Sequence, residues 1–236
     1  MEVILAKTAG FCYGVERAVE LAKRTAAEGG CVMLGSIIHN AAVVQELEAL
    51  GARTVEDVSQ IQPGETVVIR SHGEPVETYR ALEEKGARIV DATCPNVARI
   101  HQLVAKAEAE GRTPLIIGEA HHPEVLAAAS RSPHSVILEG PEELEKWLAE
   151  RPERREMPLL AVAQTTCIQT TWRNAQKILK KECTNAEIFD TICLATHKRQ
   201  TEAAELAAKV DVMVVVGDRK SANTKHLTEI CRELCP

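Results

Sequence analysis

The 236-residue sequence has no apolar run that approaches the roughly 18 residues needed by a membrane helix. At the N-terminus, Glu2 and the short apolar stretch VILA argue against a signal peptide. Basic residues are not in excess. The net charge is −6, so the chain has no general basic surface for nucleic acid. We therefore expect a cytoplasmic protein that binds neither membranes nor nucleic acid.

Signature motifs of several common sites are also missing. No two cysteines form a CxxC pair, which excludes the spacings of zinc ribbons and ferredoxins. Neither GxGxxG nor GxxxxGKS/T is present, so no nucleotide-binding fold is indicated. Polar low-complexity runs are absent too. With 45% hydrophobic residues, the chain is predicted to be globular, with one or two domains or a set of similar lobes.

What the sequence does contain is eight cysteines, at positions 12, 31, 94, 167, 183, 193, 231 and 235. A chain of this size without an export signal does not need disulfides for stability. Metal or redox chemistry is therefore the better expectation. Because CxxC pairs are absent, any metal site has to be assembled from distant segments.

Strand-like and helix-like runs alternate along the chain. Several strand-like runs are continuously apolar, which is typical of parallel sheets covered by helices on both faces. They span residues 2–9, 31–37, 65–71, 87–93, 113–119, 134–139, 158–164, 186–192 and 210–217. Helices are expected at 14–27, 76–85, 97–110, 171–181 and 199–209. The pattern predicts an α/β protein with parallel sheets.

Three cysteines share one local pattern. The segments IVDATCPNV (89–97) and IFDTICLAT (188–196) each contain an apolar strand, an aspartate three residues before a cysteine, and a helix start. In GFCYGVERAV, Cys12 also stands between a strand-like run and a helix. Unpaired N–H groups at a helix start lower the pKa of a thiol and make it a better ligand. We therefore predict that three similar lobes bring Cys12, Cys94 and Cys193 together.

The other cysteines mostly fit structural positions. Cys31 begins a strand, Cys183 lies at a helix end, and Cys231 and Cys235 lie in or after the last helix. Cys167 is the rival candidate ligand, because it follows a strand-like run and can also begin a helix. It lacks the preceding aspartate that the other two segments share.

A second group of polar residues follows the strand-like runs. His39, His72 and His122, the last with Glu124 nearby, come after three of them. Ligands of parallel sheets bind outside the carboxyl ends of the strands, and histidine N–H groups donate hydrogen bonds to phosphate oxygens. The segments QTT and GDRKSANT add hydroxyl and amide groups, the second at a helix start suited to an anion. These residues predict an anion site.

Eight motifs in register resemble one enzyme family. In chain order they are GFCYGVERAV, GSIIHN, RSHGEP, DATCPNV, HHPEV, AQTT, DTICLATHKRQ and GDRKSANT. They are similar, from end to end, to those of the 4-hydroxy-3-methylbut-2-enyl diphosphate reductases (IspH/LytB family). These oxidoreductases act last in the methylerythritol phosphate route to isoprenoids. The resemblance implies reduction of an allylic diphosphate to isopentenyl and dimethylallyl diphosphate.

The resemblance also implies an architecture. Three α/β lobes would surround a central iron–sulfur cluster with pseudo-threefold symmetry. They would comprise residues 1–94, 95–192 and 193–236, with the N-terminal strand able to pair with the third lobe. Because no nicotinamide or flavin motif is present, the electron donor would be a one-electron carrier protein of the ferredoxin or flavodoxin type.

The family's site residues map onto this chain as well. Cys12, Cys94 and Cys193 would hold a 4Fe–4S cluster, leaving one iron open to the substrate. Glu124 would deliver protons, with Thr165 bridging it to the substrate hydroxyl, and burial should raise the pKa of Glu124. The catalytic group would be His122, Glu124 and Thr165, and the diphosphate would be bound by His39, His72, His122, Thr165, Ser221 and Asn223.

Two departures from the family pattern stand out. Ala222 replaces a second serine of many relatives, and after ICRELCP the relatives normally continue through another strand and a diphosphate-binding serine turn. The third lobe is therefore expected to be incomplete. Three other functions stay open. The first is an iron–sulfur hydro-lyase without net redox, and the second is a zinc hydrolase, which the HH pair favours but the absence of HExxH opposes. The third is a non-catalytic cluster-binding module.

Overall fold

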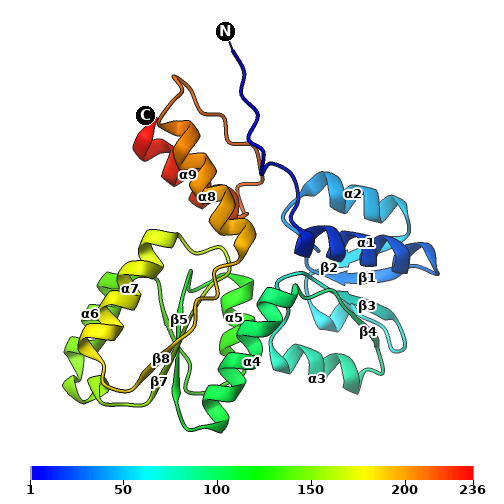
Figure 1. Cartoon of the computed structure of the whole chain (residues 1–236). Helices are drawn as coiled ribbons and strands as arrows, with labels where there is room; N and C mark the ends of the chain where they lie inside the picture. Colours follow the sequence, from blue (N-terminus) through cyan, green and yellow to red (C-terminus); the bar gives the residue numbers. More distant parts are fainter. Residues whose placement is uncertain (1, 236) are drawn as a thin grey trace.

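Two sheet-bearing lobes and a third region of two helices make up the fold (Figure 1). The structure, a computed structural model, describes residues 2–235. The first lobe contains α1 (Tyr13–Ala27), β1 (Cys31–Leu34), α2 (Ala41–Ala49), β2 (Ala52–Val55), η1 (Val58–Gln60), β3 (Thr66–Ile69), α3 (Val76–Glu84) and β4 (Arg88–Asp91). The second contains α4 (Pro95–Ala109), β5 (Thr113–Ile117), α5 (Pro123–Ala129), β6 (Val136–Leu138), α6 (Pro141–Glu150), η2 (Pro152–Arg155), β7 (Leu159–Ala163), α7 (Gln169–Glu182) and β8 (Ala186–Ile188). The third region consists of α8 (Leu194–Ala207) and α9 (Ala222–Leu234).

The two sheets have the same topology. Strand order is β2-β1-β3-β4 in the first lobe and β6-β5-β7-β8 in the second, and all neighbouring strands are parallel. The chain changes direction across the sheet between β1 and β3, and at the equivalent place between β5 and β7. Ligands of open parallel sheets bind outside the strand ends at such a point. Each lobe therefore offers one equivalent crevice.

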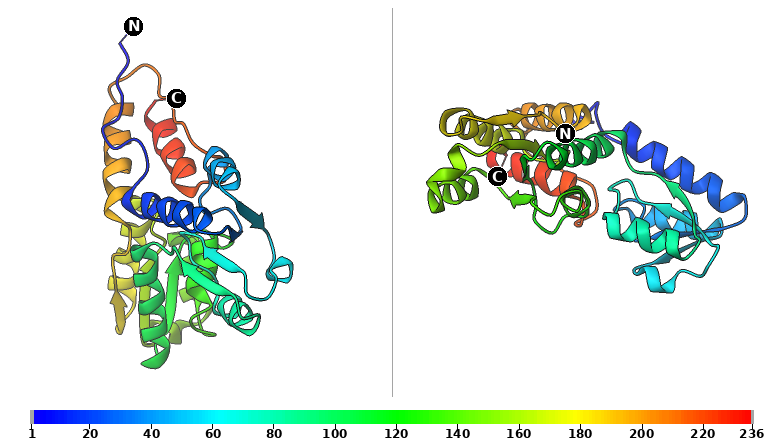
Figure 2. Two further views of the ribbon diagram at one scale, coloured as in Figure 1. Left: turned by 90° about the vertical axis from the view of Figure 1, so that its right-hand side faces the viewer. Right: turned by 90° about the horizontal axis from the view of Figure 1, so that it is seen from below.

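Helices cover both faces of each sheet, which explains the continuously apolar strands (Figure 2). In β1, Cys31 and Met33 pack with α1 and α2, while Val32 and Leu34 pack with α3 on the opposite face. In the second lobe, α6 and α7 cover one face and α4 and α5 the other. Each fully buried Val, Leu or Ile contributes about 1.5–3 kcal/mol. The α/β class with parallel sheets is thus confirmed.

Two expected strands are not strands in the described residues. The segments 2–9 and 210–217 have no sheet partner, and Leu5 and Val216 are 82% and 90% exposed. An extended segment becomes a strand only where a neighbour satisfies its backbone groups. The third region therefore consists of α8 packed against α9 (Figure 1), with the N-terminal segment beside it but no shared sheet. No helix in the described part of the chain is long and apolar enough to cross a membrane.

Candidate active site

Cys12, Cys94 and Cys193 occupy the same position in three helices. Each immediately precedes the first turn of its helix, of α1, α4 and α8 respectively, and each has extended backbone angles. All three are free thiols of intermediate exposure. The strand–cysteine–helix setting is confirmed for Cys94 and Cys193, whereas Cys12 follows an extended segment that is not a strand.

The aspartate before two of these cysteines shapes the turn. Asp91 Oδ1 accepts hydrogen bonds from Thr93 N–H at 2.8 Å and from the Thr93 hydroxyl at 2.5 Å. Asp190 Oδ1 accepts one from Ile192 N–H at 3.3 Å. Both are side-chain turns, in which aspartate bonds the backbone two residues on. This geometry explains why the aspartate stands three residues before the cysteine.

Cys94 and Cys193 each form a backbone hydrogen bond with the loop after the neighbouring strand. Cys94 N–H donates to Ser71 O at 3.0 Å, and Cys193 N–H donates to Thr165 O at 3.1 Å. Ser71 follows β3 and Thr165 follows β7, so the two bonds are equivalent in the two lobes. They place Cys94 next to the loop that carries His72, and Cys193 next to Thr165.

The segments that carry Cys12 and Cys94 are in contact. A Cβ atom added to Gly14 would lie 2.5 Å from Cys94 Sγ, so a side chain two residues after Cys12 would collide with this thiol. Arg17 of the same helix donates to Thr93 O at 3.2 Å. The first and second cysteines are therefore held on adjoining segments.

This donor set fits an iron–sulfur cluster better than a single metal ion. Cysteine thiolates are the usual ligands of such clusters. Among residues 2–235, the side chains found close enough together to bind a single metal ion are those of His39, His72 and His122. None of the cysteines belongs to this group. A cluster is larger than an ion and takes more widely spaced sulfurs, which suits three thiols at three helix starts.

The expected lowering of the thiol pKa is wrong for Cys94. Burial raises the pKa of Cys94, and the N–H groups of Asn96 and Val97 at the helix start oppose this without overcoming it. Cys167, the rival ligand, is 5% exposed inside the apolar cluster under α6 and α7. Burial raises its pKa to about 12. Because apolar side chains of the second lobe surround Cys167, it fits a core position, whereas Cys94 is only partly buried.

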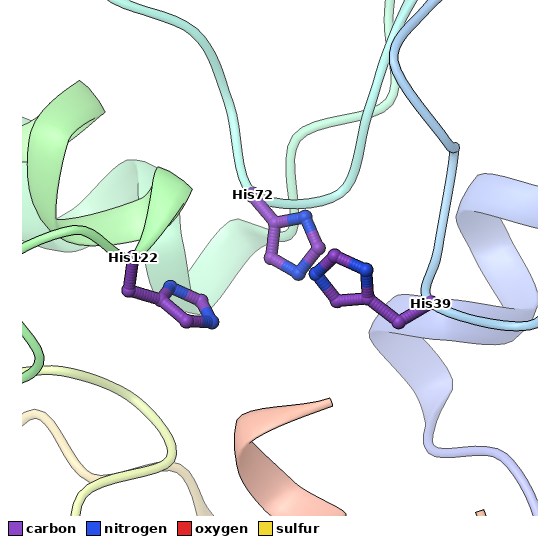
Figure 3. A group of neighbouring side chains, drawn as sticks. All are labelled: His39, His72 and His122. Carbon is purple, nitrogen blue, oxygen red and sulfur yellow. The ribbon is translucent and has the colours of Figure 1, made fainter. Parts of the chain in front are cut away.

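Figure 3 shows the imidazoles of His39, His72 and His122 pointing toward one another. The ring centroids of His39 and His72 are 5.0 Å apart, and those of His72 and His122 are 5.4 Å apart. One ring nitrogen from each lies within 4.8 Å of the others. The first two follow β1 and β3, and the third follows β5. The group therefore joins the crevices of both lobes.

Burial keeps these imidazoles neutral near pH 7. It lowers the pKa of His122 to about 4 and that of His72 well below its ordinary value. Burial also lowers the pKa of His39, and Arg70 and Lys220 add to this shift. A neutral imidazole has one N–H to donate and one nitrogen to accept. The proton's position then decides which ligand the ring can bind.

One hydrogen bond sets that position for His122. Its Nδ1 accepts the N–H of Glu124 at 3.2 Å at the start of α5. Because Nδ1 is the acceptor, the neutral ring carries its proton on Nε2. A metal ion would need a lone pair on that nitrogen, whereas a phosphate oxygen needs the N–H. The histidine group therefore suits an anion better than zinc.

Glu124 and Thr165 form a buried pair beside this group. Glu124 is 3% exposed. Its Oε1 accepts Thr165 N–H at 2.6 Å, and its Oε2 lies 2.7 Å from Thr165 Oγ1. Burial raises the pKa of Glu124, although both hydrogen bonds from Thr165 act in the opposite direction. This is the shift expected of a carboxyl group that holds a proton near neutral pH.

The third region brings the start of α9 to the histidines. Ser221 caps this helix, and Figure 3 shows the pale red helix beginning beneath the imidazoles. Asp218 and Lys220, which precede α9, both act on the pKa of His39. The helix start that carries Ser221 and Asn223 thus belongs to the same site.

Two residues that sequence reasoning missed, Lys225 and His226, hold α9 on the second lobe. Lys225 Nζ lies 2.6 Å from Glu119 Oε1. His226, which is 7% exposed, has Nδ1 2.7 Å from Thr166 O and Nε2 3.4 Å from Glu119 Oε1. Glu119 follows β5 and Thr166 follows β7. Lys225 and His226 therefore attach the helix of Ser221 to the two loops that carry the other site residues.

Arg70 was also missed, and it adds a positive charge next to the histidines. Its Nε lies 2.6 Å from Glu74 Oε1, and its charge lowers the pKa values of all three histidines. Gly35, at φ +67°, leaves space for it, because an added Cβ would lie 3.2 Å from Arg70 Nη1. The only signal in the sequence is the position of Arg70 two residues before His72.

Known proteins match this chain over its whole length. A family model described as LytB protein matches residues 3–236. Two curated 4-hydroxy-3-methylbut-2-enyl diphosphate reductases, from Geobacter sp. (strain M21) and Anaeromyxobacter sp. (strain Fw109-5), are 41% and 40% identical to it over 238 residues. Each match covers 100% of this chain and 82% of the relative.

Two solved structures are also similar. The E-1-hydroxy-2-methyl-but-2-enyl-4-diphosphate reductase from Plasmodium falciparum has a TM-score of 0.89 at 28% identity, covering 96% of this chain and 72% of that one. A structure of (E)-4-hydroxy-3-methyl-but-2-enyl diphosphate reductase, described as the terminal enzyme of the non-mevalonate pathway, has a TM-score of 0.74 at 34% identity. It covers 99% of this chain and 83% of the other.

Proposed function

The chain belongs to the LytB protein family, and we propose how its residues carry out the reaction of a 4-hydroxy-3-methylbut-2-enyl diphosphate reductase. The enzyme reduces this allylic diphosphate to isopentenyl and dimethylallyl diphosphate in the non-mevalonate pathway. Two electrons and two protons enter, the carbon–oxygen bond to the hydroxyl breaks, and water leaves. The curated relatives are named reductases, which favours this function over a hydro-lyase or a zinc hydrolase.

One observation carries the proposal: the three histidines meet beside the buried pair of Glu124 and Thr165. An anion group and a proton source are thereby placed in one site. The Cys193 turn is bonded to Thr165 O at 3.1 Å, which brings a cluster ligand to the same loop. Binding, proton supply and electron supply thus converge on Thr165.

The diphosphate is bound by N–H and O–H donors from all three parts of the chain. His39 and His72 come from the first lobe and His122 from the second, where Nε2–H is the donor. Ser221 and Asn223 add donors at the start of α9, whose N-terminal N–H groups favour a negative charge. Ala222, which lies between them, has no hydroxyl to add.

Glu124 holds the proton that the leaving hydroxyl needs. Burial raises the pKa of Glu124 and so favours its protonated form, and Glu124 Oε2 lies 2.7 Å from Thr165 Oγ1, close enough to pass a proton to that hydroxyl. The threonine hydroxyl in turn donates its own proton to the substrate hydroxyl, which leaves as water. Burial of the pair at 3% and 6% exposure keeps bulk water from competing for this proton.

Cys12, Cys94 and Cys193 would hold the iron–sulfur cluster, which we assign as 4Fe–4S. When bound, it supplies the electrons one at a time and a Lewis-acidic iron. A one-electron carrier protein of the ferredoxin or flavodoxin type delivers the electrons. A cytoplasmic location fits the eight cysteines, all of which are free thiols.

A single-turnover assay tests the function. Anaerobically purified full chain is reduced with dithionite, mixed with the allylic diphosphate, and analysed for products by mass spectrometry, with unreduced protein as the control. We expect isopentenyl and dimethylallyl diphosphate from the reduced protein alone. Loss of water without reductant would identify a hydro-lyase. No conversion by cluster-loaded, reduced protein would contradict the assigned reaction.

A further inference from the structure

The residues just before Cys12 are hydrogen-bonded to two side chains of α8. Glu202 Oε1 accepts Lys7 N–H at 2.7 Å, and Oε2 accepts Thr8 N–H at 2.8 Å and the Thr8 hydroxyl at 2.5 Å. Arg199 Nε donates to Thr8 O at 3.1 Å, and its Nη2 donates to Gly10 O at 2.6 Å. Five hydrogen bonds thus join α8 to the segment 7–10.

Four of these five hydrogen bonds involve backbone atoms of the segment 7–10, and all five use a charged side chain of α8. Arg199 and Glu202 stand three residues apart, on the same face of the helix. Charge-assisted hydrogen bonds are about twice as strong as neutral ones. The bonds from Thr8 and Lys7 also lower the pKa of Glu202, which keeps it ionised. The two side chains therefore act as one clamp on Lys7, Thr8 and Gly10.

Little else holds this segment in place. Val3 and Leu5 are 79% and 82% exposed, and residues 2–9 form no strand. Gly10, at φ +96°, then turns the chain toward Cys12. Without an apolar core or a sheet neighbour, the path into Cys12 depends on side-chain contacts.

The clamp also connects the three cysteines. Cys193 directly precedes α8, and Arg199 and Glu202 of this helix hold the segment that leads to Cys12. On the other side of Cys12, Gly14 faces Cys94 Sγ and Arg17 bonds to Thr93 O. The contacts thus run from the helix of Cys193 through Cys12 to Cys94.

We propose that Arg199 and Glu202 are positioning residues that place Cys12 for the cluster by clamping residues 7–10 to the helix of Cys193. The inference rests on the proposed assignment of Cys12 and Cys193 as cluster ligands. It assigns the two residues no contact with substrate. Loss of the clamp should loosen one of the three ligands while leaving the histidine group and the Glu124–Thr165 pair intact.

The test uses Arg199→Ala and Glu202→Gln in the full chain. In Glu202→Gln, an NH₂ group replaces one acceptor oxygen and faces an N–H of Lys7 or Thr8. Lys198→Ala and Glu205→Gln are matched controls, because both residues are exposed on α8. Deuterium uptake at residues 7–8, in cluster-free protein, measures the clamp without the cluster. The rate of iron release to a chelator, in cluster-loaded protein, measures cluster retention.

We expect both clamp variants to exchange the amides of Lys7 and Thr8 about tenfold faster, which corresponds to the loss of about 1.4 kcal/mol. Iron release should also accelerate about tenfold, with the melting temperature of the cluster-free chain unchanged. Because the two side chains act together, the double variant should lose little beyond either single one. Arg199→Lys, which retains a donor, should recover part of the retention.

Cys12→Ser distinguishes failure of this inference from failure of the ligand assignment. If Cys12→Ser keeps a full cluster, the assignment of Cys12 is wrong. If Cys12→Ser loses the cluster while Arg199→Ala and Glu202→Gln release iron at the wild-type rate, the clamp does not position Cys12. Equal iron release by the clamp variants and by Lys198→Ala would overturn the proposal in the same way.

Discussion

The two sheet-bearing lobes and the third region position their functional residues by different means. In the lobes, strand ends and backbone bonds do this, as in the pairing of Cys94 N–H with Ser71 O. The third region has no strand among its described residues. One backbone bond, from Cys193 N–H to Thr165 O, joins the start of α8 to the second lobe. Beyond it, the two helices are attached by side chains, such as Lys225 on α9 and Glu202 on α8.

The comparison teaches where the site is sensitive to single substitutions. A backbone bond survives replacement of its own side chain, whereas a side-chain contact is lost with one substitution. Buried apolar strands on both faces also stabilise the lobes. We therefore expect chemistry to depend on individual residues of the second lobe, and attachment of the third region to depend on a few polar contacts.

The largest effect is expected at the proton source of the second lobe. Glu124→Gln preserves size but removes the titratable proton, so turnover should fall about 10²–10⁴-fold while diphosphate affinity and cluster content stay unchanged. Steady-state kinetics measures the turnover, and titration calorimetry measures the diphosphate affinity. Glu142→Gln is the matched control, because Glu142 also follows a proline in the first turn of a helix but is exposed. Near-normal turnover in Glu124→Gln would leave Glu124 a structural residue.

Acidification should next destabilise the second lobe. Burial lowers the pKa of His101 and of His122 to about 4, with Arg131 adding to the shift at His101. An unfolded histidine has a pKa of about 6.5, so the unfolded chain takes up protons first as the pH falls. The free energy of unfolding should then fall by up to roughly 1.4 kcal/mol per pH unit for each histidine between about pH 6.5 and 4.

Urea unfolding at about pH 7 and about pH 5 checks this dependence. His101→Gln removes one of the two groups, so the loss of stability on acidification should shrink by the contribution of one histidine. His121→Gln, at an exposed position beside His122, is the control and should leave the dependence as in the wild type. An unchanged dependence in His101→Gln would show that its pKa is not lowered.

A smaller effect is expected on binding by the first lobe. His39→Ala or His72→Ala removes a donor to a charged oxygen, which is worth about 1.5–3 kcal/mol or roughly 10–150-fold in affinity. Titration calorimetry with inorganic diphosphate measures the loss, and the cluster spectrum should not change. His121→Ala serves as the exposed control. If both site variants bind diphosphate like the wild type, the anion site lies elsewhere.

The smallest effect concerns the attachment of α9. Lys225 and Glu119 are partly exposed, and pairs of this kind contribute about 0–1 kcal/mol. Lys225→Met and Glu119→Gln should each weaken diphosphate binding by no more than about fivefold. Because the two residues contact each other, the double variant should lose less than the sum of both. Lys209→Met, which changes an exposed residue after α8, is the control. If the losses of affinity of the two single variants add fully in the double variant, the pair does not act through its contact.

Local patterns made much of the site predictable from sequence. Asp91 and Asp190 each precede a cysteine by three residues, and the structure explains this spacing by side-chain turns. Continuously apolar runs ending in histidine predicted buried strands with polar loops. Glu124 also follows such a run, and the rise in its pKa that was predicted from burial is confirmed. In each case the determining contacts are local or follow from strand order.

The features that sequence reasoning missed depend on distant contacts. Lys7 and Glu202 are 195 residues apart in sequence, and Lys225 and Glu119 are 106 apart. No periodicity encodes such pairs. The strands expected at 2–9 and 210–217 have suitable apolar residues but no neighbour in a sheet. The lowering of the pKa expected at Cys94 was outweighed by burial, which depends on the packing of the whole site.

The central claim is that Cys12, Cys94 and Cys193 hold the iron–sulfur cluster of this reductase. Iron and acid-labile sulfide content, measured together with the Mössbauer spectrum on anaerobically purified protein, tests it most directly. Wild-type protein should carry iron and sulfide in equal amounts, and each of the three Cys→Ser variants should lose them, whereas Cys31→Ser and Cys167→Ser should not. A colourless, zinc-loaded wild type, or a full cluster in Cys94→Ser, would contradict the account.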